Sequence, residues 1–400
     1  MRLVLRAAES TGAQRLIDVT RAHVDSCLYH GEATLDFVDR LVVGGARTRI
    51  PTTLNVGALD LLHPELYRGE QRAAERGRLL MDRYRALGAR PTFTCAPYQL
   101  ADARPALGEQ VAWGESNAIA FCNSVLGART NRYGDFIDIA AAITGRVPDA
   151  GLHRTDARRA TLVLRLADDI PEALRDTDVL SPVLGIVLGR RAGSTVAAID
   201  GLPPRQSEDR LKAIGAAAAS SGSVAMFHVV GSTPEAATLD DALQHRAPER
   251  VELIRFAELR AARDELTTAA GERLAAVSLG TPHASLDELE RYAAMLGRRH
   301  VHFDVECLVS TGRDVMAVAT ERGIVGRLRD SGVELLVDTC SYIAPILRNA
   351  AGPVMTDSGK WAYYAPGNIG AAVVFGSSAE CIRSAVAGHV VRDLTPWGGA

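Results

Sequence analysis

The chain has 400 residues, of which 47% are hydrophobic and 23% charged, and its formal net charge at pH 7 is -3. This length predicts two or three α/β lobes, and the charged fraction is typical of a soluble enzyme. Because no long basic run is present, a nucleic-acid partner is not expected. No stretch approaches about eighteen uninterrupted apolar residues and no signal peptide is recognisable, so we expect no membrane span and a cytoplasmic protein.

The first part of the chain alternates expected helices with polar loops. Apolar residues recur at helical spacing over 12–28, 36–43 and 68–88. Short strands are expected over 47–50 and 91–95, and each runs into a polar loop. Loops at the carboxyl ends of strands are where α/β proteins place ligands, so both loops are candidate site segments.

A crowded polar segment, residues 113–153, follows. Ten of its polar side chains lie within eighteen positions: Glu115, Ser116, Asn117, Cys122, Asn123, Ser124, Arg129, Thr130, Asn131 and Arg132. Such a crowd indicates either a polar network at a helix end or the floor of a site for a small anionic ligand. Residues 117–125 are expected to form a helix or a buried strand, and 135–144 a helix.

The remainder of the chain predicts two further lobes. Strand-like residues 159–168 begin a second lobe, and 240–272 is expected to be an exposed, linking helical region. A βαβαβ alternation starts at 274. The tail from 353 is expected to form strand, loop and strand. The predicted lobes are 1–158 with 345–400, 159–240, and 241–344.

Six cysteines are spread along the chain without a CxxC pair, so disulfides are not expected in a cytoplasmic protein. Cys307 lies within an apolar run and is predicted to be a packing thiol. Cys95 and Cys340 instead follow expected strands directly, in loops rich in threonine, serine and proline. Metal binding and simple packing both remain open for these two thiols.

Charged residues offer several candidates for binding or catalysis. Lys360 is one of very few lysines, and it suits an ammonium that anchors a carboxylate, a Schiff-base nucleophile or a solvated loop residue. Arg129 and Arg132 suit either bidentate carboxylate recognition or ion pairs with Asp135 or Glu115. Glu115 would serve as an acid or base if burial raised its pKa.

Taken together, these segments resemble the large subunit of aconitase X. The resembling segments span the chain in order: 51–55, 94–98, 115–132, 145–153, 280–283, 337–340 and 358–364. The resemblance implies an aconitase-like α/β fold, with several lobes and mixed or parallel sheets around a central cleft. It also implies a hydro-lyase that removes water from a small hydroxy acid. In the bacterial type this acid is cis-3-hydroxy-L-proline, which gives Δ1-pyrroline-2-carboxylate, and in archaeal relatives it is phosphomevalonate.

The same resemblance implies a cofactor and a partner. Iron is expected, as an iron–sulfur cluster or as an iron site held by cysteines. Relatives often carry cysteine where Thr281 stands, and threonine is a poor substitute for a thiolate. Cys122 is therefore expected to join Cys95 and Cys340 as a metal ligand. No segment resembles the small domain of the family, so a small partner subunit is expected to supply a serine base.

The resemblance also assigns roles to the polar loop residues. Glu115, Ser116 and Lys360 are the expected catalytic residues. The expected substrate-binding residues are Thr52, Thr53, Asn55, Tyr98, Ser116, Asn117, Arg129 and Lys360. Two other functions stay open: a pyridoxal-phosphate lyase that uses Lys360, although no glycine-rich phosphate cradle is evident, and a non-catalytic ligand-binding subunit.

Overall fold

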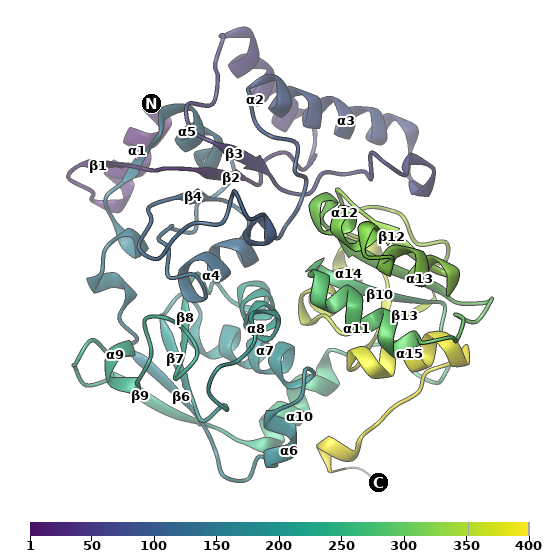
Figure 1. The fold of residues 1–400 in the computed structure, drawn as a ribbon. Helices are drawn as coiled ribbons and strands as arrows, with labels where there is room; N and C mark the ends of the chain where they lie inside the picture. The colour runs from purple at the N-terminus through teal and green to yellow at the C-terminus, as the bar shows by residue number, and fades with distance from the viewer. Residues whose placement is uncertain (351, 399–400) are drawn as a thin grey trace.

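The computed structural model describes residues 1–350 and 352–398 and contains three α/β lobes grouped around a common centre (Figure 1). In Figure 1 the first lobe runs from purple to blue, the second is teal, and the third is green to yellow. This arrangement confirms the expected α/β fold class. None of the described helices is long and apolar enough to cross a membrane.

The first lobe is built on a small parallel sheet with the strand order β3-β2-β4. Its strands are β2 (Ala22–Val24), β3 (Thr52–Leu54) and β4 (Ala112–Trp113). An antiparallel pair, β1 (Leu16–Asp18) and β5 (Arg146–Pro148), lies beside it. The helices of this lobe are α1 (Arg2–Thr11), α2 (Glu32–Val43), α3 (Gln71–Ala86), α4 (Ser116–Ser124) and α5 (Ile137–Thr144), with the short turns η1 (Pro64–Leu66), η2 (Pro97–Gln99), η3 (Gly151–His153) and η4 (Asp156–Arg158).

The second lobe is a parallel sheet with the order β8-β7-β6-β9. The strands are β6 (Leu162–Leu166), β7 (Ala197–Asp200), β8 (Phe227–Val229) and β9 (Arg250–Ile254). The helices are α6 (Glu172–Arg175), α7 (Leu180–Ala192), α8 (Glu208–Ser221), α9 (Leu239–Ala242) and α10 (Phe256–Glu265). Because β9 completes this sheet, the expected linking helical region 240–272 is wrong and belongs to the second lobe.

The third lobe is a five-stranded parallel sheet with the order β12-β11-β10-β13-β14. The strands are β10 (Ala276–Ala284), β11 (Glu306–Thr311), β12 (Val333–Leu336), β13 (Pro353–Thr356) and β14 (Ala372–Phe375). The helices are α11 (Leu286–Leu296), α12 (Arg313–Glu321), α13 (Ile324–Asp330), α14 (Gly359–Ile369) and α15 (Ser378–Ala387), and η5 (Thr395–Trp397) follows. The tail after 345 was expected to pack with the first lobe. That expectation is wrong, because β13 pairs directly with β10.

Two local predictions in the first lobe also fail. Residues 12–28 are not a helix: Gly12 takes a left-handed conformation that ends α1, and the residues beyond it form β1 and β2, each with one β-branched residue, Ile17 and Val24. Residues 91–95 run beside β3 without becoming a strand. Only an isolated bridge joins Thr53 to Arg90 there, and the Thr92 hydroxyl takes over a backbone contact to Leu54.

The lobes share one continuous apolar core. The largest buried cluster extends from α7 and β6 of the second lobe into β13 and α14 of the third, and it includes Val56 and Cys95 of the first. The three lobes are therefore held in a defined relation, and loops from different lobes meet at their common centre. Cys307 lies in a separate core of the third lobe, as its apolar run predicts.

Close packing of α7 against α8 leads to a first prediction. A Cβ added at Gly185 would overlap the Ile214 carbonyl oxygen and lie 2.7 Å from the Ala217 side chain. Gly185→Ala is expected to lower the free energy of unfolding by about 1–3 kcal/mol, because overpacking forces the helices apart. Gly326 in α13 is the matched control, since its added Cβ meets open space. Gly326→Ala should stabilise the protein by about 0.4–1 kcal/mol. Urea unfolding of both variants checks this, and equal midpoints would contradict it.

Candidate active site

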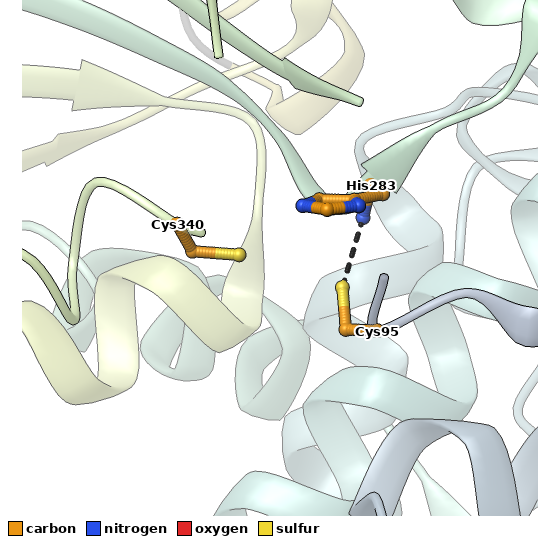
Figure 2. Close-up of side chains that lie close together, drawn as sticks. All are labelled: Cys95, His283 and Cys340. Atoms are coloured by element: carbon orange, nitrogen blue, oxygen red, sulfur yellow. Dashed lines mark hydrogen bonds between the residues drawn. The ribbon is translucent and has the colours of Figure 1, made fainter. Parts of the chain in front are cut away.

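Three side chains with metal-binding atoms meet where the first and third lobes touch. The ligand atoms of Cys95, His283 and Cys340 all lie within 4.8 Å of one another, and all three residues are buried (Figure 2). Cys95 precedes η2, His283 lies near the end of β10, and Cys340 follows β12. Each of the three residues lies in a polar segment at the end of an apolar segment. Because such ends meet at one edge of a sheet, the three side chains can come together there.

Hydrogen bonds determine the orientation of the His283 ring. Its Nε2 lies 3.1 Å from the carbonyl oxygen of Thr339, and its Nδ1 lies 3.0 Å from the Thr94 hydroxyl. Since a carbonyl only accepts, Nε2 carries a proton, and Nδ1 faces the Thr94 hydroxyl. The backbone N–H of His283 also donates to the Cys95 sulfur at 3.2 Å (Figure 2). Such partners are typical of the groups that orient a metal-binding histidine.

The loop that carries Cys340 is held by Asp338. This residue has a left-handed backbone with φ of 64°, and its carboxylate accepts two hydrogen bonds of 2.5 Å from Arg313. The N–H of Leu61 donates to the same carboxylate, and the N–H of Gly57 donates to the Asp338 carbonyl. The strained turn is thus tied to the first lobe, and Cys340 is placed opposite Cys95.

The two thiols differ in their affinity for a proton. Burial disfavours the charged form of Cys95, but the Cys340 thiol donates a hydrogen bond to it and His283 adds positive potential, so the pKa of Cys95 is lowered. The same hydrogen bond, together with burial, raises the pKa of Cys340. Thiolates are the form that binds metals, so Cys95 is the thiol prepared for that role.

The chemistry of this group fits iron. Two thiols and an imidazole are donors that iron accepts in proteins. Among the described residues, the buried hydroxyls of Thr281 and Thr339 have no hydrogen-bond partner, and they lie next to His283 and Cys340 in the chain. A bound group with polar or ionic character would satisfy these atoms, whereas an empty apolar pocket would not need them.

Cys122 does not join the other two thiols, so its prediction as a metal ligand is wrong in this structure. Asn117 on α4 faces the site and donates to the Cys95 carbonyl at 2.9 Å. Cys122 follows five residues later, which is about 140° around the helix axis from Asn117. Its side chain packs in a separate apolar cluster with Phe121 and Leu126, and burial raises its pKa.

A buried ion pair stands beside the thiols. Lys360, in the first turn of α14, donates from Nζ to Glu115 Oε1 at 2.5 Å, and the two side chains are only 6% and 5% exposed. The second Glu115 oxygen accepts from the Asn117 amide and from the N–H of Ala118. Burial alone would lower the pKa of Lys360, but Glu115 and its neighbours raise it well above the ordinary value. A protonated amine is no nucleophile, so a Schiff base at Lys360 has no support here.

Several residues expected to bind substrate instead form hydrogen bonds to other residues of the site. Tyr98 stacks on Phe121 and donates its hydroxyl to Asn117 Oδ1 at 2.9 Å. The Ser116 hydroxyl donates to Glu115 at 3.3 Å. Asn117, held by Tyr98 and Glu115, in turn positions the Cys95 loop. These residues fix the geometry of the ligands rather than offering free donors.

The threonines after residue 51 are likewise occupied. Thr52 donates to the Ile50 carbonyl at 2.8 Å, and the Thr53 hydroxyl lies 2.8 Å from Nδ1 of His23. Both line a cavity of about 230 Å³ beside Trp113, separate from the thiols. Of this predicted group, only Asn55 reaches toward the site, where its amide donates to Asp25.

Arg129 lies on the outside of the first lobe. Its Nη1 donates to the His153 carbonyl at 3.0 Å, and its backbone bridges to Gln110. It lines an open groove together with Asp149, whereas Lys360 lines a different cavity. Arg129 and Lys360, the two candidates for holding the substrate carboxylate, therefore line separate cavities, and Lys360 is the one near the thiols.

A cavity of about 590 Å³ between the second and third lobes reaches Lys360. Thr281, Ser358 and Lys360 line it, together with the basic residues Lys212 and Arg291. Its volume is within the range of small-molecule sites. A small acid entering here would meet the ammonium of Lys360.

Sequence reasoning missed three residues of this region. His283 was not among the expected site residues; Ser285 is the N-cap of α11, which leaves His283 available to the site. The expected helix over 12–28 concealed His23 and Asp25, which in fact lie in β2 and directly after it. Of the three, Asp25 directly follows a strand, and a polar residue in that position was the signal available for it.

Comparison with known proteins supports a single family. Models of the aconitase X first, second and third domains match residues 1–156, 160–264 and 274–387. The chain is 43% identical to the cis-3-hydroxy-L-proline dehydratase of Pseudomonas aeruginosa, over 99% of this chain and 68% of that protein. It is 41% identical to the enzyme of the same name from Hypocrea jecorina, over 97% and 65%. The chain thus spans about two thirds of the length of these two relatives.

Archaeal relatives match over nearly their whole length. The chain is 34% identical to the phosphomevalonate dehydratase large subunit of Methanothermobacter thermautotrophicus, over 96% of this chain and 93% of that protein. The crystal structure of Thermococcus kodakaraensis aconitase X in its holo-form superposes with a TM-score of 0.85 at 29% identity, covering 96% and 94% of the two chains.

Proposed function

The chain belongs to the aconitase X family, and we propose that it is the larger polypeptide of a hydro-lyase that converts cis-3-hydroxy-L-proline to Δ1-pyrroline-2-carboxylate. The observation that carries this proposal is the buried Cys95–His283–Cys340 group beside the Lys360 ammonium. Hydroxyproline is favoured over phosphomevalonate because the identity to the two hydroxyproline dehydratases, 43% and 41%, exceeds the 34% to the archaeal large subunit.

Cys95, Cys340 and His283 would hold iron, as a single ion or within an iron–sulfur cluster. When bound, iron supplies a Lewis acid for the departing hydroxyl group. The ordered ring of His283 and the bond from its backbone to Cys95 keep these donors in place before any ligand arrives. Such preorganisation limits the conformational cost of loading the site.

Lys360 would bind the carboxylate of the substrate. One of its three N–H donors is used by Glu115, and the other two remain for a ligand in the adjoining cavity. Glu115 is a poor candidate for the proton-abstracting base, because donors from Lys360, Asn117 and Ala118 all stabilise its charged form. We assign Glu115 the role of positioning Lys360.

Dehydration breaks the C2–H and C3–O bonds of the ring, and the proton and hydroxide leave as water. The resulting enamine becomes Δ1-pyrroline-2-carboxylate by moving a proton from nitrogen to carbon. Both carboxylate oxygens of Glu115, the acid paired with Lys360, are already occupied by N–H donors. This supports a base, such as a serine, that is supplied by a small partner polypeptide. The name "large subunit" of the archaeal relatives supports the same arrangement.

The test is an assay of the chain produced together with its small partner polypeptide and loaded with iron under anaerobic conditions. Turnover of cis-3-hydroxy-L-proline is expected, with the cyclic imine trapped by 2-aminobenzaldehyde, and none is expected with phosphomevalonate. Turnover of phosphomevalonate alone would overturn the substrate. Absence of turnover with both acids, in an iron-loaded complex, would overturn the dehydratase and leave a ligand-binding subunit.

A further inference from the structure

The parallel sheet of the first lobe ends in a row of polar residues. Val24 pairs with Leu54, and His23 with Trp113, so the residues that follow these strands lie side by side. Backbone bonds from Asn55 and Gly114 to β2 continue the pairing one step further. Asp25, after the middle strand, therefore stands between Asn55 and Glu115 at the carboxyl edge of the sheet.

Asp25 is the carboxylate of this row that lacks a cation. Its Oδ1 accepts from the Asn55 amide, and no described residue donates to its Oδ2 or forms an ion pair with it. The side chain is partly exposed, so a ligand can reach it. Glu115, the other carboxylate, is already satisfied by Lys360 and by two N–H donors.

The charge of this region is therefore unbalanced. Lys360 pairs with Glu115, whereas Asp135 and Asp138 add negative potential at Asp25, and His23 adds no charge because burial lowers its pKa to about 3. Burial, and then the negative charge of Glu115, raise the pKa of Asp25 to about 8. A cation placed beside Asp25 would offset both effects and favour its ionised form.

Residues behind Asp25 hold it in place. The Thr53 hydroxyl lies 2.8 Å from Nδ1 of His23, the His23 ring lies edge-on to Trp113 and beside Asn55, and Asn55 donates to Asp25. The backbone N–H of Asp25 donates to Asp138 at 2.7 Å. This buried support resembles that of a recognition group rather than of a surface acid.

We infer that Asp25 is the specificity-determining residue that binds the protonated ring nitrogen of the substrate. The inference rests on the proposed function, because an imino acid carries a secondary ammonium next to its carboxylate. Lys360 pairs with Glu115, and Asp25 stands next to Glu115 at the sheet edge, so a positive and a negative group lie near the same carboxylate, as such a zwitterion requires. An acid without the nitrogen would cover the Asp25 carboxylate without supplying a cation, and a carboxylate that loses its water without gaining a partner disfavours binding.

Binding of two ring acids to the iron-loaded complex tests this inference without requiring turnover. L-Proline carries the ammonium, and cyclopentanecarboxylate has the same ring without it. Wild-type protein should bind L-proline about 10–100-fold more tightly, as a hydrogen bond between charged groups would provide. Asp25→Asn should lose that preference, because it weakens L-proline binding and removes the unpaired charge that disfavours cyclopentanecarboxylate. Isothermal calorimetry gives both dissociation constants.

Asp149→Asn is the matched control, since Asp149 pairs with Arg15 at the far groove and should leave the preference unchanged. A preference that persists in Asp25→Asn, or is missing in the wild type, would overturn the inference. If Asp25→Asn does not fold, the same two dissociation constants are measured for Asp25→Ser, which should also lose the preference for L-proline. Preferential L-proline binding without dehydration of cis-3-hydroxy-L-proline would refute the proposed function and leave the role of Asp25 intact.

Discussion

Replacing Cys340 by serine is expected to abolish iron binding and, with it, dehydratase activity. Cys340 supplies one of the two buried thiols of the site, and a serine hydroxyl is a far weaker iron ligand. Since changes to residues that only orient a ligand already cost about 10–100-fold in metal affinity, loss of a ligand should cost more than about 100-fold. Iron per chain after desalting, measured with a colorimetric chelator, checks the result independently of activity.

Cys122→Ser is the matched control for this experiment. Cys122 is equally buried, but it lies on the opposite face of α4 from Asn117, in an apolar cluster. Its iron content should equal that of the wild type. Iron loss in Cys122→Ser, or retention in Cys340→Ser, would show that the loaded protein uses a different set of ligands.

His283→Ala addresses the third donor. If the imidazole is a ligand, this variant should lose iron as Cys340→Ser does. Thr94→Val removes only the hydroxyl that lies 3.0 Å from Nδ1, so it should keep most of the iron. Equal iron content in His283→Ala and the wild type would limit His283 to an orienting role through its backbone bond to Cys95.

Lys360→Met is expected to lower the free energy of unfolding by about 3–5 kcal/mol, because it leaves the Glu115 carboxylate buried without its cation. The double variant Glu115→Gln, Lys360→Met should recover part of this loss, since no unpaired charge remains. Urea unfolding of the metal-free protein measures both. Glu115→Gln is measured as well. If the loss of unfolding free energy in the double variant equals the sum of the losses in Lys360→Met and Glu115→Gln, Glu115 and Lys360 are not coupled.

Arg85 provides the comparison at the surface. Its ion pair with Asp82 is half exposed, with side chains 52% and 51% accessible. Arg85→Met should change the free energy of unfolding by less than about 1 kcal/mol, because exposed pairs are screened by water.

The same Lys360→Met variant should also raise KM for the hydroxy acid, since it removes the ammonium proposed to bind the carboxylate.

Local patterns predicted much of the fold. Helices α2 and α3 follow from amphipathic spacing, and Gly44 ends α2 where the sequence indicates. The polar loops expected after apolar strands made Cys95 and Cys340 candidates for metal binding, with packing left open, although residues 91–95 do not form a strand. The resemblance to aconitase X depended on the order of these loops along the chain, which a sequence records completely.

Only the tertiary structure decided which of these groups meet. Asn117 and Cys122 belong to the same polar segment, but Asn117 faces the site and Cys122 does not. Successive residues of α4 are rotated by about 100° around the helix axis, and the packing of α4 against the core decides which of them face the site. The pairing of Lys360 with Glu115, 245 residues apart, depends on the strand order β10-β13. Spacing along the chain carries no information about such contacts, since they arise from how separate lobes share one core.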